Sequence, residues 1–146
     1  MKHPLTSNYR LLGFYAIFWL VVGFVNIVLQ VLWYNIPFVN SLLDTFTSYV
    51  LYPLIGSSIW YSIRYNSLEE VSVSRLIAFH LIAASILCGI WVYISYVIYQ
   101  PFIKENDKFL NDSIQNKIII GYVMYAMFYV FFYALNYYNS LKDKIK

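Results

Sequence analysis

Four long apolar segments occupy almost the whole chain, and no other feature constrains its fold as strongly. They run over residues 11–33, 40–63, 75–100 and 117–138, with short polar breaks between them. An α-helix rises about 1.5 Å per residue, so about 20 residues cross a hydrocarbon core of about 30 Å. Each segment is therefore long enough to cross a bilayer once.

The composition supports helices in a membrane rather than a soluble domain. Of the 146 residues, 61% are hydrophobic and 12% are charged, whereas soluble domains carry about 25% charged residues. The segments are apolar on every face and lack the period-two alternation of barrel strands. The sequence thus predicts an all-α integral membrane protein, a four-helix bundle with up-down-up-down order that forms a single domain over residues 1–146.

The distribution of Lys and Arg predicts the orientation of the bundle. Of the ten such residues, Lys104, Lys108 and Lys117 lie in the predicted third connection, and the first connection, residues 34–39, has none. The other seven lie in the two tails and the second connection. Because the positive-inside rule places the side richer in Lys and Arg in the cytoplasm, we predict that both termini are cytoplasmic.

The chain also contains an internal repeat. The tetrapeptide YVLY at residues 49–52 aligns with YVMY at residues 122–125, and YNSL occurs at both 65–68 and 138–141, all at an offset of 73. The first and third segments match more weakly at an offset of 65. The pattern predicts two tandem helical hairpins of the same orientation, related by a pseudo-twofold axis along the membrane normal.

The residues after the fourth segment continue a helical pattern. Leu141 and Ile145 are four residues apart and therefore share one face of a helix. No glycine or proline follows Gly121. We expect residues 139–146 to begin a stalk helix that leaves the membrane on the cytoplasmic side.

Two sequence patterns give this plan a family resemblance. The pattern WYxxRYN occurs at residues 60–66, after the second segment, and YYxxLKxK occurs at residues 137–144, after the fourth. Together with four segments and cytoplasmic ends, they resemble the N-terminal membrane domain of LytS-type sensor histidine kinases of Bacteroidetes-like bacteria.

The resemblance implies an input domain without its catalytic part. In that family the fourth helix leads through a coiled coil into a phosphoacceptor domain and an ATP-binding domain. The phosphoacceptor motif of the family is absent here, since neither His3 nor His80 stands in such a context. The resemblance implies a multi-pass protein of the bacterial inner membrane, a homodimer, a kinase domain in the same parent chain and a response regulator. It implies no cofactor and no metal, and the net charge of +3 is too small and too spread out to indicate nucleic acid.

Polar residues within the apolar segments are the candidate sensing residues. Asn26 and Gln30 are four apart and share one helix face, where interhelical contacts are favoured over ligand binding. Asp44 lies near the outer surface. The favoured interpretation of Asp44 is a wetted carboxylate near a helix N-terminus. The alternative is a proton-sensing or cation-binding group paired with Gln30.

For two further features of the helices, a packing role is favoured over ligand binding. His80 lies near the cytoplasmic end of the third segment and has no second histidine at helical spacing, so a hydrogen-bonded packing role is favoured over metal or haem ligation. The fourth segment carries a stripe of tyrosines that we expect in the bundle core rather than in a quinone or aromatic-ligand site. The stripe consists of Tyr122, Tyr125, Tyr129 and Tyr133.

These observations favour one function and leave two others open. The favoured one is an anchoring and input module, in which a change near Asn26, Gln30 and Asp44 shifts or rotates the fourth helix. A small transporter is supported by the repeat and Asp44, although no acidic residue lies at the midplane of a segment. A stand-alone scaffold or assembly protein is the other alternative. The predicted output residues are Tyr137, Tyr138, Leu141 and Ile145.

Overall fold

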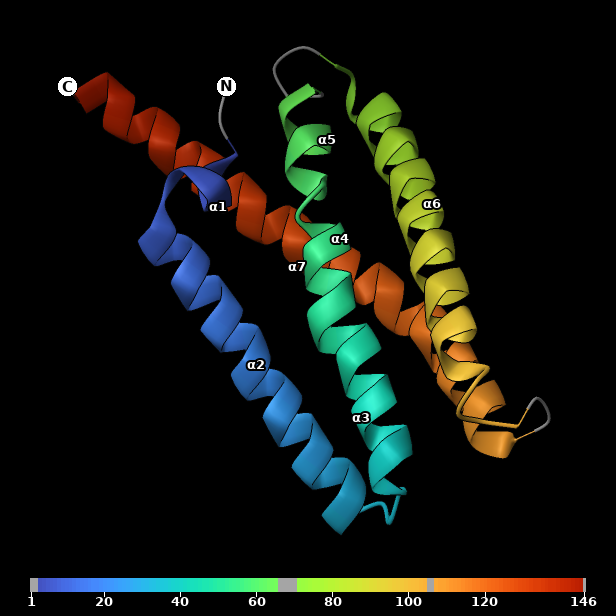
Figure 1. The fold of residues 1–146 in the computed structure, drawn as a ribbon. Helices are drawn as coiled ribbons and strands as arrows, with labels where there is room; N and C mark the ends of the chain where they lie inside the picture. The colour runs from blue at the N-terminus through green and yellow to red at the C-terminus, as the bar shows by residue number, and fades with distance from the viewer. Residues whose placement is uncertain (1–2, 66–70, 105–106, 146) are drawn as a thin grey trace.

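The computed structural model describes residues 3–65, 71–104 and 107–145, and these ranges are almost entirely helical, without a strand (Figure 1). Three of the helices are long and apolar enough to cross a membrane. The predicted all-α membrane fold is therefore confirmed. The elements are α1 (Pro4–Ser7), α2 (Tyr9–Leu32), α3 (Phe38–Phe46), the π-helical turn η1 (Thr47–Leu51), α4 (Tyr52–Gly56), α5 (Ile59–Tyr65), α6 (Val73–Tyr99) and α7 (Lys108–Ile145).

The second predicted segment is a broken helix. It passes from α3 through η1 into α4, turns at residues 57–58 and continues as α5, and these pieces follow one another along the height of the bundle (Figure 1). Pro53 accounts for the π turn, because proline has no N–H and its ring clashes with the carbonyl four residues earlier. The amide of Tyr52 instead bonds the carbonyl of Thr47, five residues earlier. No single piece is long enough to cross a bilayer, although residues 38–65 together run the full height.

The helix α7 is the longest element and differs most from its predicted bounds. It has 38 residues, which correspond to a length of about 57 Å against a hydrocarbon core of about 30 Å. It begins at Lys108 rather than at Lys117, because a helix outside the bilayer does not need an apolar sequence. In Figure 1 it crosses the bundle obliquely, and it contacts both α6 and α5. It therefore connects the two ends of the molecule.

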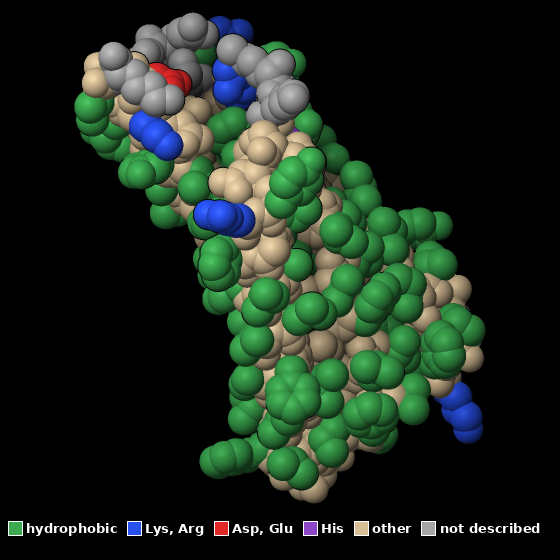
Figure 2. All heavy atoms as spheres, turned by 60° about the vertical axis from the view of Figure 1, so that its left-hand side comes forward, with side chains coloured by type: hydrophobic (Ala, Val, Ile, Leu, Met, Phe, Trp, Pro, Cys, Tyr) green, Lys and Arg blue, Asp and Glu red, His purple; other side chains and the backbone are tan. Residues whose placement is uncertain are grey.

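Both ends of the described chain lie at the same end of the bundle, which we call the terminal end (Figure 1). The end of α5 and the start of α6 also lie there, whereas the connection from α2 to α3, the end of α6 and the start of α7 lie at the opposite end. In Figure 2 hydrophobic side chains cover the middle of the molecule, and charged side chains lie mainly near its ends. Exposing an apolar surface of this extent to water is unfavourable, whereas contact with the hydrocarbon core of a bilayer is not.

One contact between helices occurs in both hairpins at the predicted offsets. Gly23 of α2 lies against the Thr45 side chain of α3. In the second hairpin Cys88, 65 residues after Gly23, donates to the carbonyl of Ile118, 73 residues after Thr45, at 3.6 Å. At this pair of positions the two helices are thus in contact in both hairpins. Residues 66–68, most of the first YNSL copy, lie outside the described residues.

The tyrosine stripe of α7 forms only part of the core. Tyr125 is buried, but Tyr122 and Tyr133 are 40% and 39% exposed, so the prediction that both lie in the core was wrong. The reason is that lipid-facing and core-facing sides are both apolar, and periodicity cannot separate them. The buried residues of this part of α7 are Gly121, Met124, Tyr125, Phe128 and Phe132.

Gly121 sets the distance between α6 and α7. A Cβ atom at this position would lie 2.6 Å from the sulfur of Cys88 and 3.2 Å from the ring of Trp91. The backbone carbonyl of Gly121 also accepts a hydrogen bond of 2.8 Å from the hydroxyl of Tyr52. A side chain here would push the two helices apart and strain that hydrogen bond.

We expect Gly121→Val to destabilise the protein by about 1–3 kcal/mol, the usual effect of overpacking a closely packed site. The measurement is thermal unfolding in detergent. Gly89→Val is the matched control, because Gly89 lies on α6 with nothing within 4 Å of the position of its Cβ. Equal losses in the two variants would contradict the role assigned to Gly121.

Candidate functional site

A buried ion pair joins the second crossing segment to α7. The Nζ atom of Lys117 lies 2.8 Å from Oδ1 of Asp44, with Lys117 2% and Asp44 18% exposed. Asp44 lies six residues after the start of α3 and Lys117 nine residues after the start of α7, which is about 9 Å and about 14 Å along the two helices. The pair is therefore inside the bundle, nearer to the end opposite the termini.

Four donors hydrogen-bond to the carboxylate of Asp44. Its Oδ1 accepts from Lys117 at 2.8 Å, from the Ser113 hydroxyl at 3.0 Å and from the Tyr99 hydroxyl at 3.1 Å. Its Oδ2 accepts from the amide of Gln30 at 2.7 Å. Since these residues lie on α2, α3, α6 and α7, this single carboxylate links four helices of the bundle.

The ammonium of Lys117 is enclosed by protein groups. Besides Asp44 it donates to the hydroxyl of Ser48 at 2.8 Å. It also lies 5.2 Å from the ring centroid of Trp91 and 5.6 Å from that of Tyr99. Aromatic rings at this distance attract a cation through their quadrupole, most strongly where water is excluded. The aromatic rings and hydrogen bonds together replace the hydration that Lys117 would have in water.

The π turn is part of the same network. The indole N–H of Trp91 donates to the carbonyl of Thr47 at 2.7 Å. The hydroxyl of Thr47 donates to the carbonyl of Leu43 at 2.9 Å and lies 3.1 Å from the hydroxyl of Tyr99. Single π turns inside α-helices occur frequently at functional sites. The irregular backbone next to Asp44 is thus held by the side chains that surround the ion pair.

This arrangement can act as an electrostatic link between α3 and α7. Each oxygen of Asp44 accepts hydrogen bonds from the protein, three at Oδ1 and one at Oδ2. Within the described ranges no group of three or more His, Cys, Asp or Glu side chains is placed to hold a metal ion. Separating the two charges would leave each one buried without its partner, which is strongly unfavourable. The pair therefore favours an arrangement in which α3 and α7 stay joined at this point.

The structure brings together three of the four predicted polar residues. Gln30 bonds Asp44, and one turn away the amide of Asn26 donates to the Thr45 hydroxyl at 2.9 Å, a contact between α2 and α3. The cation beside Asp44 is Lys117, and Asp44 is 18% exposed, so its carboxylate is largely but not wholly covered by the protein. The residues form a network in which the predicted Asp44–Gln30 pairing is present.

His80 lies apart from this network. Its Nδ1 is 2.9 Å from the hydroxyl of Tyr125, and the ring centroid is 4.5 Å from that of Tyr129. Its Nε2 is buried and has no hydrogen-bond partner among the described residues. The contacts are those of the packing histidine that was favoured from the sequence.

Lys117 is the charged member of the site that sequence reasoning missed, and its neighbours Ser113, Tyr99 and Ser48 were not predicted as site residues either. It was assigned to the third connection because the fourth segment was expected to begin there, and this assignment was wrong, since α7 begins at Lys108. The repeat contained the missing signal. Lys117 follows Asp44 by 73 residues, the offset of the repeat, so the two occupy equivalent positions in the two hairpins. Equivalent positions near a pseudo-twofold axis face each other.

The predicted output residues lie at the far end of α7 from the ion pair. Tyr137, Tyr138, Leu141 and Ile145 are all within this helix and are 60%, 64%, 40% and 85% exposed. Their large apolar side chains have little cover from the rest of the chain. Lys146, the last residue of the expected stalk, lies outside the described residues.

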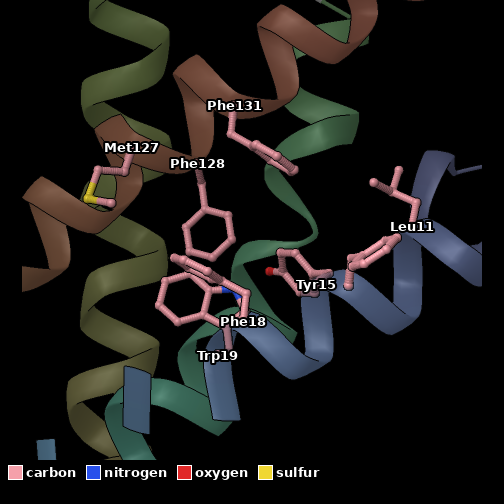
Figure 3. A pocket seen from close by; sticks show the side chains of 8 residues that line it. Leu11, Tyr15, Phe18, Trp19, Met127, Phe128 and Phe131 are labelled. Carbon is pink, nitrogen blue, oxygen red and sulfur yellow. The ribbon is translucent and has the colours of Figure 1, made fainter. Parts of the chain in front are cut away.

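A groove lies between α2 and α7 on the surface, apart from the ion pair (Figure 3). Its walls are almost wholly apolar, and the rings of Trp19 and Phe128 stack with centroids 5.4 Å apart. The hydroxyl of Tyr15 is directed to the carbonyl of Pro53 at 2.9 Å. No charged side chain lines this groove, so it offers a lipid-facing surface rather than a chemical site. Its lining consists of Leu11, Phe14, Tyr15, Phe18, Trp19, Met127, Phe128 and Phe131.

Comparison of the chain with protein-family models, with curated proteins and with solved structures finds no match. The functional interpretation therefore rests on the geometry of the site and on the sequence.

Proposed function

We propose that this chain is a membrane anchoring and signal-input module in which the Asp44–Lys117 pair holds α7 and α7 transmits its state to the terminal end. The observation that carries the proposal is that one partner of a buried ion pair belongs to a single helix of 38 residues. Because a continuous helix is stiff along its axis, a shift or rotation at Lys117 reaches Leu141 and Ile145 without an intervening joint.

The revised position of Lys117 strengthens the expected orientation. With Lys117 inside the bundle, only Lys104, in the connection between α6 and α7, and Lys108, at the start of α7, remain of the three Lys residues assigned to that side. The positive-inside rule then favours cytoplasmic termini more strongly than the sequence count did. In this orientation the ion pair lies toward the outside of a bacterial inner membrane, and the end of α7 projects into the cytoplasm.

The mechanism has a paired and a separated state. An external change that draws Asp44 away from Lys117 removes the contact that fixes α7 against α3. The helix then repacks along its length, including at Phe132, whose ring centroid is 6.2 Å from that of Trp60 on α5. The output of the mechanism is a change in the angle or register of the exposed face of α7 that holds Leu141 and Ile145. In a LytS-type sensor kinase this face would pair with that of a second copy and lead into the kinase domain, which acts on a response regulator.

Disulfide crosslinking of the chain in lipid vesicles tests this function. Leu141→Cys and Ile145→Cys are introduced one at a time after Cys88→Ala has removed the native thiol. We expect both positions to crosslink two copies, and we expect Asp44→Asn to change the ratio of the two yields at least about threefold. Ser85→Ala is the matched control, because it removes one contact between α6 and α7, with the hydroxyl of Tyr122, outside the ion pair and should leave the ratio unchanged. Equal ratios in folded Asp44→Asn and in the parent protein would refute transmission along α7.

A small transporter is the second candidate, because ionisable pairs inside membranes often mark ion or proton pathways. The distance of Asp44 from the start of α3, about 9 Å, places it away from the midplane, where coupling ions bind. The four protein donors to the carboxylate of Asp44 also favour a structural link. Ion or proton flux into proteoliposomes that is lost with Asp44→Asn would favour the transporter.

A further inference from the structure

The two hairpins resemble each other in the grooves between their own helices. We call residues 3–65 the first hairpin and residues 73–145 the second. Each hairpin has a groove between its two crossing segments, and most of the residues that line the second groove are equivalents of residues that line the first. The first groove is also lined by His3, which is 8% exposed. The shared positions include 12/77, 15/80 and 19/84 in the first segments and 49/122, 53/126 and 57/130 in the second segments.

The grooves between the two hairpins are equivalent as well. The groove of Figure 3 lies between α2 of the first hairpin and α7 of the second. Another groove has residues 55–62 of the first hairpin on one side and α6 of the second on the other. At the offsets of 65 and 73, positions 14, 18, 128 and 131 of one groove correspond to 79, 83, 55 and 58 of the other. The two hairpins are thus related by an approximate two-fold axis, which follows the height of the bundle because both hairpins run in the same direction.

The Asp44–Lys117 pair lies at this axis. A two-fold rotation exchanges positions 44 and 117, so a direct contact between them must lie close to the axis itself. The contact is the ion pair, with Nζ 2.8 Å from Oδ1. Next to it the hydroxyl of Tyr52 crosses from the first hairpin to the carbonyl of Gly121 in the second at 2.8 Å. Two hairpins with closely similar grooves therefore carry opposite charges at the position where they meet.

The charge at the axis determines which hairpins can pair. Two first hairpins packed by the same two-fold axis would bring Asp44 against Asp44, and two second hairpins would bring Lys117 against Lys117. Lys117 is 2% exposed in the observed bundle, so water would shield neither pair of like charges. A buried charge without a partner is strongly unfavourable, and facing like charges are a common means of rejecting a wrong partner. The interface therefore selects one first hairpin and one second hairpin.

This selection does not depend on whether the two hairpins belong to one chain. The contacts across the interface are the same for hairpins of a single copy and for hairpins of two copies. Both ends of the described chain, the end of α5 and the start of α6 lie at the terminal end (Figure 1). Two copies can therefore part their hairpins at this end without moving a tail through the bilayer. Exchange of an identical element between copies is a low-cost route to a dimer.

We propose that the face of the first hairpin around Asp44 is an interaction surface for the second hairpin of another copy, so that two copies form a dimer by exchanging second hairpins. Each bundle of this dimer contains Asp44 from one copy and Lys117 from the other, with the surroundings that the pair has in a single chain. The inference depends on the fold and on the repeat, and it holds whether or not α7 transmits a signal. A dimer that forms side by side through Leu141 and Ile145 contains no Asp44–Lys117 pair between copies, so the two arrangements are distinguishable.

A membrane-permeable carbodiimide, which condenses a carboxylate and a neighbouring amine to an amide, tests the exchange. Full chains with Asp44→Asn and one affinity tag are produced in the same cells as full chains with Lys117→Met and a second tag. Neither variant can form the amide at this site alone, because each lacks one of the two groups. In the exchanged dimer, Asp44 of the Lys117→Met copy meets Lys117 of the Asp44→Asn copy. We expect a covalent dimer that carries both tags and is linked between residues 44 and 117 by peptide mass spectrometry.

The matched control is Asp44→Asn produced with both tags, which measures crosslinking by other acidic and basic groups. The complementary variants should exceed it at least about tenfold, because each single chain is left with an unpaired buried charge that exchange removes. The parent chain with both tags tests the exchange without relying on the stability of the variants, and its linked dimer should also exceed the control. The proposal is overturned if neither combination gives a dimer linked at residues 44 and 117 above the control. A complex that contains both tags without this amide is a side-by-side dimer and overturns it equally.

Discussion

The variant Lys117→Met is expected to lose about 3–5 kcal/mol of folding free energy, the usual effect of removing one partner of a buried ion pair. The carboxylate of Asp44 would stay buried and would keep Gln30, Ser113 and Tyr99 as donors, but no cation would remain beside it. Reversible unfolding in mixed micelles measures the loss. Lys108→Met is the matched control, since Lys108 is an exposed residue of the same helix, and a surface change of this kind stays within about 0.5 kcal/mol.

A double variant separates the contribution of charge from that of packing. Asp44→Asn combined with Lys117→Met removes both charges and keeps an amide that can bond Gln30, Ser113 and Tyr99. Replacing a whole buried pair by neutral groups is often close to neutral for stability, so the double variant should recover most of the loss. If the double variant is as unstable as Lys117→Met alone, the loss comes from packing of the lysine stem and the electrostatic link is refuted.

The sequence predicted the crossing segments well because length and apolarity are what a bilayer demands. The predicted segments 11–33 and 75–100 differ from α2 and α6 by only a few residues at each end. The same criterion cannot detect backbone irregularity. Pro53 lies within the second predicted segment. A count of apolar residues does not register that proline lacks the backbone N–H that a regular helix needs. The π turn and the break at 57–58 were missed for this reason.

The candidate site was only half visible in the sequence. Spacing placed Asn26 and Gln30 on one face and singled out Asp44 as a charge inside an apolar segment. Lys117 was missed because a cation at the expected end of a segment is ordinarily interfacial. Its pairing depends on where α7 begins, which is decided by residues 108–116 and their packing rather than by their hydropathy. The alignment of positions 44 and 117 in the repeat was the available clue.

The burial of His3 had no signal of its own in the sequence. Residues 1–10 are mostly polar, and nothing in their pattern indicates that any of them enters the bundle. The imidazole of His3 lies 2.9 Å from the carbonyl of Ser57, at the break between α4 and α5. That break was itself unexpected. Such a contact is determined by tertiary structure, because the acceptor exists only after the second crossing segment has folded with its turn.

Trp91→Ala is expected to destabilise the protein by about 3–5 kcal/mol, the range for removing a large buried aromatic side chain. Trp91 is completely buried and packs edge to face on Tyr52 with centroids 4.6 Å apart. In a membrane the loss comes mainly from van der Waals contacts between helices, since lipid is as apolar as the core. Trp33→Ala is the matched control, because Trp33 is 77% exposed at the end of α2. Equal losses in the two variants would contradict the central position of Trp91.

Trp91→Phe then distinguishes the ring from its N–H. Phenylalanine retains an aromatic face near Lys117 and an edge for Tyr52, but it cannot donate to the carbonyl of Thr47. We expect this variant to lose about 1–2 kcal/mol, as for one hydrogen bond to a buried group. If the hydrogen bond fixes the π turn next to Asp44, the same variant should also change the crosslinking ratio at Leu141 and Ile145. A destabilised variant with an unchanged ratio would mean that Trp91 supports packing alone and that the π turn does not take part in positioning the ion pair.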